Sequence, residues 1–258
     1  MCLILFAYNA HPSYRLVLAA NRDEFYDRPT KPADFWADHP QVLAGLDLKE
    51  KGAWLGVTKA GRFAAVTNYR DPASWMEGAP SRGRLVRRYL TGSESPEAYL
   101  QKLLPRAKKY NGFNLLAGDA ESLWVYSNRD RAQKLAPGVY GLSNRFLDTP
   151  WPKVLRGKKL LKAALAEKGK VLEEALFALL ADRRMPPDSR LPDTGVNRDW
   201  ERILSPMFIS SPVYGTRSST VLLVGKNGRI TFVEKTFNGG AEPWMTSRFS
   251  FLRRKEGT

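Results

Sequence analysis

Short apolar runs separated by turn residues dominate the pattern of hydrophobic and polar positions along the chain. The first two, residues 2–8 and 15–21, flank a turn-rich interval with Pro12 in its middle, which is typical of a β-hairpin. Three later pairs repeat this pattern: 54–58 with 62–68, 114–117 with 123–126, and 220–224 with 229–234. The pattern therefore predicts a series of antiparallel strand pairs.

Helical periodicity is confined to two groups of segments. The first group covers residues 82–90 and 95–108, and Ser95 is placed to cap the second of these helices. The second group covers residues 152–167 and 172–180, where apolar residues form one stripe. Between residues 183 and 200, three prolines predict a long irregular segment, and loops of that length are usually functional or mobile.

The order of these elements indicates the fold class. Antiparallel hairpins, two groups of helices and no alternation of strand and helix favour an α+β fold over a doubly wound parallel sheet. The composition agrees with a globular protein, because 43% of the 258 residues are hydrophobic and only 26% are charged. Length alone permits one large domain or two small ones.

Cysteine and histidine are scarce, and this excludes several kinds of site. The chain has one cysteine, Cys2, and two histidines, so we expect no disulfide framework, no cysteine-based zinc cluster and no histidine-rich metal centre. The apolar run at residues 3–8 is too short for a signal peptide or a membrane span. We therefore expect a cytoplasmic protein without an integral membrane span.

The net charge of +15 leaves nucleic acid as an alternative partner. The basic residues are spread along the chain in separate segments, and none of them lies in a recognisable nucleic-acid motif. We therefore expect solvated basic helix faces that attract anions in general, and no specific nucleic-acid binding.

Cys2 is the first candidate for chemistry. Removal of the preceding methionine would leave a thiol and a free α-amine on one residue, and the amine could then act as the base for its own side chain. The alternative is that Cys2 is a small hydrophobe at the start of a buried strand.

Polar residues also gather where other apolar runs end. Asn21, Arg22, Asp23 and Glu24 follow the second strand, and alternation puts two of them on each face. Further polar positions of this kind are Asn68, Arg70, Asn144 and Arg217. Asparagine amides can supply oxyanion donors and a guanidinium can hold a carboxylate or phosphate, although both residue types are also ordinary turn chemistry.

Several of these segments, taken in order, resemble the NRDE family, which is named for residues 21–24. They are MCLILFAY, AANRDEFYDRP, AGLDL, GAWLGVT, VTNYRDP, YNGFNLL, GLSNRFLDTPWPKV and YGTRSSTVLLV. The family is similar to the N-terminal nucleophile hydrolases. The resemblance therefore implies one domain over residues 1–258, folded as a four-layer αββα sandwich.

Within that superfamily, the chain is similar to the cholylglycine and penicillin V amide hydrolases. This resemblance implies that Cys2 is the nucleophile, in an amide hydrolase acting on a non-peptide C–N bond without a cofactor. It also implies catalytic roles for Asn21, Asp23, Asn68, Asn144 and Arg217. Ala20 stands where those hydrolases have an arginine, which removes a charge that favours the thiolate.

Members of the NRDE family are also associated with moving haem and with lipid or acyl-coenzyme A handling. The first functional expectation is therefore binding and trafficking of haem, or of a similar amphipathic anion, with hand-off to acceptor haemoproteins. Haem would then be cargo and not a permanent prosthetic group. The residues expected to bind this ligand are Cys2, Arg22, Glu24, Asn68, Arg70, Asn144 and Arg217.

Overall fold

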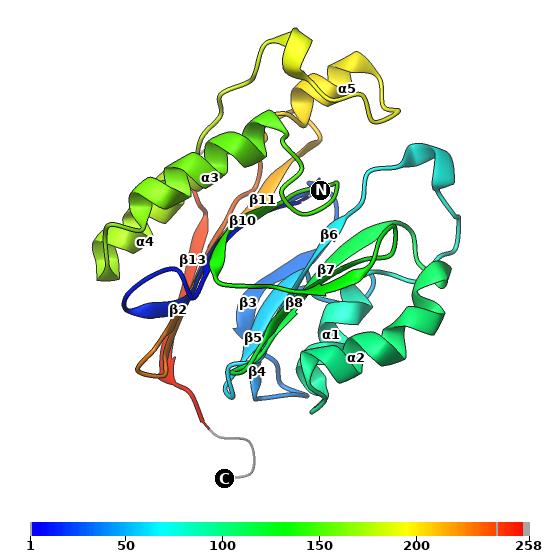
Figure 1. Cartoon of the computed structure of the whole chain (residues 1–258). Coiled ribbons are helices and arrows are strands. Elements are labelled where there is room, and N and C mark those ends of the chain that lie inside the picture. The colour runs from blue at the N-terminus through cyan, green and yellow to red at the C-terminus, as the bar shows by residue number, and fades with distance from the viewer. Residues whose placement is uncertain (1, 241, 255–258) are drawn as a thin grey trace.

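The computed structural model describes residues 2–240 and 242–254, and its core consists of two stacked antiparallel sheets (Figure 1). The first sheet has six strands in the order β10-β1-β2-β11-β12-β13. These strands are β1 (Cys2–Tyr8), β2 (Tyr14–Phe25), β10 (Gly138–Leu142), β11 (Tyr214–Gly225), β12 (Arg229–Thr236) and β13 (Met245–Leu252).

The second sheet has seven strands, which follow one another in chain order from β3 to β9. They are β3 (Thr30–Phe35), β4 (Val42–Asp47), β5 (Leu55–Thr58), β6 (Phe63–Asn68), β7 (Phe113–Gly118), β8 (Leu123–Ser127) and β9 (Ala132–Lys134). Side chains such as Phe6, Leu18 and Phe232 meet Leu43 and Leu116 between the two sheets, and they form the central core.

Helices cover the outer faces of both sheets. On the second sheet lie α1 (Gly83–Thr91), α2 (Pro96–Leu103) and the 3-10 turn η2 (Leu104–Lys109), and on the first lie α3 (Pro152–Ala164) and α4 (Gly169–Leu180) (Figure 1). Leu85 and Tyr89 pack on the second sheet, whereas Leu161 and Leu176 pack on the first. The predicted α+β class and four-layer αββα sandwich are confirmed by this order of layers.

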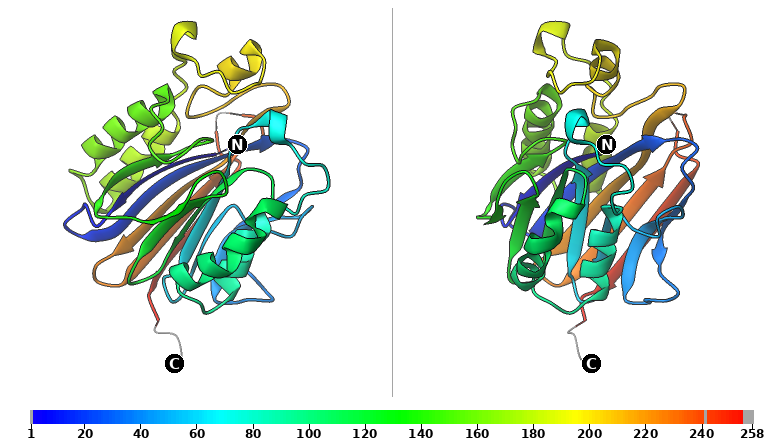
Figure 2. Two further views of the ribbon diagram at one scale, coloured as in Figure 1. Left: turned by 45° about the vertical axis from the view of Figure 1, so that its right-hand side comes forward. Right: turned by 90° about the vertical axis from the view of Figure 1, so that its right-hand side faces the viewer.

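The segment between α4 and β11 extends beyond the ends of the strands (Figure 2). It contains only two short helices among the described residues, η3 (Asp188–Arg190) and α5 (Arg198–Ile203). The irregular segment predicted for residues 183–200 is therefore confirmed, apart from η3 and the start of α5. One more 3-10 turn, η1 (Pro72–Ser74), follows β6.

The strand register decides which polar side chains share a face. Cys2 lies opposite Arg22, Arg22 opposite Ser218, and Ser218 opposite Thr236, so these residues form one row across the first sheet. Ile4 and Ala20, which have the same strand parity, belong to the core between the sheets. The row with Cys2 therefore faces the second sheet, at one end of the sandwich.

A β-bulge at Arg217 changes this parity in β11. Ser218 opposes Arg22 and Thr216 opposes Asp23, so Arg217 is the extra residue between the two pairs. Because of the bulge, Thr216 and Ser219 both lie on the face that packs against α3 and α4. Arg217 itself donates hydrogen bonds to three backbone carbonyls, those of Phe25, Tyr26 and Arg28.

Among the described residues, no helix combines the length and the apolar character that crossing a membrane would need.

Candidate functional site

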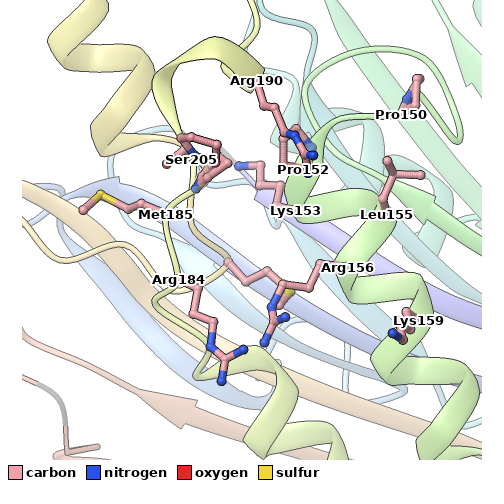
Figure 3. Close-up of a pocket in the computed structure, with 13 residues that line it drawn as sticks. Pro150, Pro152, Lys153, Leu155, Arg156, Lys159, Arg184, Met185, Arg190 and Ser205 are labelled. Atoms are coloured by element: carbon pink, nitrogen blue, oxygen red, sulfur yellow. The ribbon is translucent and has the colours of Figure 1, made fainter.

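Two hollows lie near the N-terminal end of β1. The first is a cavity of about 110 Å³ at the edge of the space between the sheets, and it is lined by Cys2, Arg22, Trp54 and Asn68. We call it the Cys2 cavity. The second is a groove of about 740 Å³ between α3 and the segment that follows α4 (Figure 3). We call it the α3 groove.

The thiol of Cys2 is held in a way that favours its protonated form. Burial is the largest influence and raises the pKa of the thiol. The carboxylate of Asp23 raises that pKa further, whereas the guanidinium of Arg22 and a hydrogen bond with the Asp23 backbone lower it. Burial also raises the pKa of Asp23. For both groups the effect of burial is larger than that of the neighbouring cations and hydrogen bonds, which favour the charged form.

The four residues of the NRDE motif point alternately to the two faces of β2. Asn21 and Asp23 face the helices α3 and α4, and the Asp23 carboxylate accepts a hydrogen bond from Thr216 at 2.8 Å. Arg22 and Glu24 face the second sheet, where the Arg22 guanidinium lies over the Trp54 ring, 4.4 Å from its centroid.

Both the nitrogen and the oxygen of the Asn21 side-chain amide make hydrogen bonds. Its Nδ2 donates to the carbonyls of Leu180 at 2.9 Å and Met207 at 2.8 Å, and its Oδ1 accepts from Ser219 at 2.6 Å. The side chain is buried, with 1% of its surface exposed. Asn21 therefore ties the end of α4 and the chain before β11 to β2, and its amide protons are not directed at the Cys2 cavity.

Asn144 is also engaged in the fold. Its Nδ2 donates to the backbone carbonyl of Asn68 at 2.9 Å, and its own carbonyl accepts from the backbone N–H of Arg70 at 2.7 Å. Of these three residues, Asn68 lines the Cys2 cavity.

Arg70 forms a buried ion pair outside the Cys2 cavity. Its Nη1 lies 2.7 Å from the Glu201 carboxylate, and its guanidinium lies over the Trp151 ring at 5.0 Å from the centroid. Burial lowers the pKa of Arg70, and Glu201 opposes that effect. The pair connects the chain that follows β6 to α5.

The predicted site residues therefore divide into two sets. Cys2, Arg22, Asp23, Glu24 and Asn68 line one cavity. Four predicted residues do not line it: Asn21, Arg70, Asn144 and Arg217. Three of them donate hydrogen bonds to backbone carbonyls of other segments, and Arg70 binds the buried carboxylate of Glu201. The catalytic and ligand-binding roles assigned to these residues stay predictions.

Three charged residues of the Cys2 cavity were not among those expected from the sequence. Asp47 binds Arg28 at 2.6 Å and lies 3.8 Å from Arg22, and Arg82 lines the same cavity. Asp47 belongs to the AGLDL motif, so its place in an ordered motif was the available signal.

The α3 groove combines cations with apolar side chains. Its cationic lining residues are Lys153, Arg156, Lys159, Arg184 and Arg190. Its apolar lining includes Leu155 and Met185, which are 56% and 68% exposed. Among the described residues, no aspartate or glutamate lines it. The sequence pattern did not predict this groove, because its two walls lie about thirty residues apart in regions with no shared motif.

Lys153 lies at the base of the groove, on the first turn of α3. Its side chain is 5% exposed and its Nζ donates to the carbonyl of Leu204 at 2.9 Å. Burial lowers its pKa to about 8, and Asp23 on the neighbouring strand acts in the opposite direction. Lys153 therefore lines the α3 groove and also interacts electrostatically with Asp23, which lines the Cys2 cavity.

Within residues 2–240 and 242–254, no group of three or more His, Cys, Asp or Glu side chains could hold a metal ion.

Comparison with known proteins places the chain within one family over nearly its full length. A family model described as Transport and Golgi organisation 2 matches residues 1–239. The chain is 39% identical to the bovine Transport and Golgi organization protein 2 homolog, with 97% of this chain and 99% of that protein covered. It is 38% identical to the human homolog and 29% identical to the Drosophila melanogaster protein, with coverage of 97% and 93% of this chain and 99% and 93% of theirs. The predicted membership of the NRDE family is confirmed.

Two solved structures are similar to this chain at 10% sequence identity. One is a Caenorhabditis elegans N-acylethanolamine-hydrolyzing acid amidase ortholog, with a TM-score of 0.48 and coverage of 86% of this chain and 92% of the other. The second is a conjugated bile acid hydrolase from Clostridium perfringens, with a TM-score of 0.44 and 98% of both chains covered.

Proposed function

The chain belongs to the Transport and Golgi organisation 2 family, and on the geometry of its α3 groove we propose that it binds and transfers amphipathic anions, with haem as the first candidate. The observation that carries the proposal is the combination of cations and apolar side chains in a groove of about 740 Å³. Ligand sites in proteins usually have volumes of roughly 300–1,000 Å³.

The size of the two hollows favours the α3 groove over the Cys2 cavity as the place for such a ligand. The Cys2 cavity has a volume of about 110 Å³, which accommodates only a fragment of a haem or an acyl chain. The ligand-binding residues expected around Cys2 would then reach at most one polar end of the molecule.

The charges of the groove support an anionic ligand. Arg156 is held by Asp182, with Nε at 2.7 Å from a carboxylate oxygen. Lys159, Arg184 and Arg190 make no side-chain salt bridge with any described residue, and they are exposed. Propionates or phosphates would therefore meet cations that have no carboxylate partner in the part of the chain that the structure describes.

The apolar lining supports a ligand with a large apolar body that can leave again. Met185 supplies an exposed thioether, which is a possible but weak haem ligand. Weak ligation in an open groove fits transfer to an acceptor haemoprotein better than permanent retention. Such transfer would take place in the cytoplasm, as the scarcity of cysteine led us to expect.

Haem titration followed at the Soret band tests this proposal. We expect saturable 1:1 binding at a salt concentration that suppresses adsorption to the basic surface, and about tenfold weaker binding in the double variant Arg184→Ala/Arg190→Ala. The matched control is Lys108→Ala/Lys109→Ala, which removes the same charge from an exposed turn away from the groove. Equal loss of binding in both double variants, or unlimited adsorption by the unmodified chain, would contradict the proposal.

The second candidate function is the Cys2-dependent amide hydrolase. It is favoured by the placement of Cys2, Asp23 and Asn68 around one cavity. The engagement of Asn21 and Asn144 in the fold makes it the less supported of the two. Trapping of an acylated Cys2 in the intact mass would support it, and undiminished amide hydrolysis by Cys2→Ala would eliminate it.

A further inference from the structure

We propose that the amine of Lys153 is a nucleophile that captures aldehydes entering the α3 groove as an imine. The position of Lys153 is the first observation behind this proposal. It lines the α3 groove and also a small cavity of about 10 Å³ shared with Arg70 and Glu201. In Figure 3 its side chain points from α3 toward Ser205, across the base of the groove.

The bonding of the amine is the second observation. Nζ makes one hydrogen bond, to the carbonyl of Leu204 at 2.9 Å, and no ion pair with any described residue. A buried lysine is nearly always paired with a carboxylate. Because Lys153 has only a neutral carbonyl as its partner, loss of its proton breaks no salt bridge.

The groups around Lys153 favour a neutral amine in sum. Burial has the largest effect on its pKa, and Arg70 adds to it. Asp23, Cys2 and Glu201 act in the opposite direction, but Glu201 already binds Arg70. With a pKa of about 8 instead of 10.5, the neutral fraction of Lys153 at pH 7 is about two orders of magnitude above that of an exposed lysine.

The chemistry of the step follows from the neutral amine. The nitrogen lone pair attacks the carbonyl carbon, and the nitrogen gives up its two protons to the carbonyl oxygen. That oxygen leaves as water, and a C=N bond replaces the C=O bond. No oxidant, reductant or cofactor is required. The reaction is reversible by hydrolysis, so the groove would hold and release an aldehyde.

The lining of the groove defines the class of aldehyde. An apolar body would lie against Leu155 and Met185, and an anionic group would lie near Arg184 or Arg190. Lys159 lines the same groove but is exposed, so it serves as an internal reference for a lysine in the same ionic surroundings.

Pyridoxal 5′-phosphate is the probe for the first experiment, because it carries both an aldehyde and a phosphate. The full-length protein is mixed with about one equivalent of the probe at pH 7, reduced with borohydride, and digested for peptide mapping. We expect modification of Lys153 to exceed that of Lys159 at least tenfold. Modification spread evenly over exposed lysines would overturn the proposal.

Variants separate the amine from its structural role. Lys153→Arg keeps a cation and a donor for the Leu204 carbonyl but forms no imine, and Lys159→Met is its matched control. We expect the adduct to disappear in the first variant and to persist in the second. A measurement on the unmodified chain, competitive acetylation against pH, does not depend on folding of a variant. An ordinary lysine pKa for Lys153 in that measurement would contradict the proposal.

This inference shares the groove with the proposed function, and the two fail separately. Lys153→Arg that loses the adduct but keeps saturable haem binding would support both. Loss of haem binding in Arg184→Ala/Arg190→Ala without any Lys153 adduct in the unmodified chain would support the function and remove the inference. An adduct on Lys153 without haem binding would support the inference and contradict the proposed function.

Discussion

The Cys2 cavity and the α3 groove lie on opposite faces of the first sheet, and the side chains that line them differ in how their charges are paired. In the Cys2 cavity, side chains of both signs are paired with each other, as in the contacts of Asp47 with Arg28 and Arg22. In the α3 groove, four of the five cations have no carboxylate partner among the described residues, and apolar side chains are left exposed.

This difference distinguishes polar side chains that hold the fold together from polar side chains that are available to a ligand. The motif after which the family is named contributes an asparagine that holds three segments together and an arginine packed on Trp54. The groove, in contrast, has exposed apolar side chains and three exposed cations, Lys159, Arg184 and Arg190, that make no salt bridge with any described residue, and a ligand could contact both. A motif can therefore mark the scaffold of a site and not the contact surface.

The largest effect is expected from Asn21→Leu, which would destabilise the part of the fold that carries both the Cys2 cavity and the α3 groove. The substitution leaves the carbonyls of Leu180 and Met207 and the hydroxyl of Ser219 without their buried partner. At about 1–3 kcal/mol for each buried unpaired group, we expect roughly 3–5 kcal/mol less stability in urea unfolding.

Asn197→Ala is the matched control for that experiment. Asn197 caps α5 by accepting a hydrogen bond from the Trp200 backbone at 2.9 Å, and loss of a cap costs about 1 kcal/mol. Equal destabilisation by the two variants would mean that Asn21 is an ordinary turn residue.

A smaller effect, which depends on pH, is expected from Glu234→Gln on the side of the Cys2 cavity. Glu234 is buried between the sheets, where it accepts a hydrogen bond from the Ala33 backbone at 2.7 Å, and burial raises its pKa to about 7. The unfolded chain loses this proton near pH 4.5, so between pH 4.5 and 7 the folded state binds more protons and its stability falls as pH rises.

Comparison of the two proteins isolates the contribution of Glu234. We expect the stability of the unmodified chain, relative to Glu234→Gln, to fall by about 3 kcal/mol between pH 4.5 and 7, since one pKa unit corresponds to about 1.4 kcal/mol. Chemical denaturation at several pH values measures it. A difference that stays constant over this range would show that Glu234 has an ordinary pKa.

The smallest effect is expected from Cys2→Ala on ligand binding. Because the thiol lines the Cys2 cavity and not the α3 groove, the haem affinity should change less than about twofold, well under 1 kcal/mol. The same Soret titration measures it. A tenfold loss would place Cys2 in the haem site and remove the separation between the two hollows.

Much of the fold could be predicted from the sequence. The four strand pairs correspond to β1 with β2, β5 with β6, β7 with β8, and β11 with β12. The predicted helix 95–108 ends early as an α-helix, because Pro105 lacks the N–H group that the next turn requires, and the chain continues as 3-10.

Other strands were missed for identifiable reasons. β3 contains Pro32 and a register shift against β4, and it lies at the edge of its sheet, where proline is tolerated. β13 is also an edge strand, and its residues are mostly exposed, so its hydrophobic pattern is weak. β4 and β9 were not predicted either.

The candidate site was predictable only in part. The strand parity of Arg22 could be counted from Ala20, and the structure places both on the face toward the second sheet. The α3 groove could not be predicted in this way, because it forms where α3 meets the loop after α4 and depends on tertiary contacts such as that of Arg156 with Asp182.

The hydrogen bonds of Asn21 have a consequence for how this chain can vary. They hold Leu180 and Met207 to the same side chain, so the segment between them forms a loop that is closed at its base. Residues inserted at its exposed tip would leave both anchor points in place, and even doubling the loop length costs only about 0.6 kcal/mol in closure entropy. One wall of the groove can therefore change in length and composition while the sheets behind it stay the same.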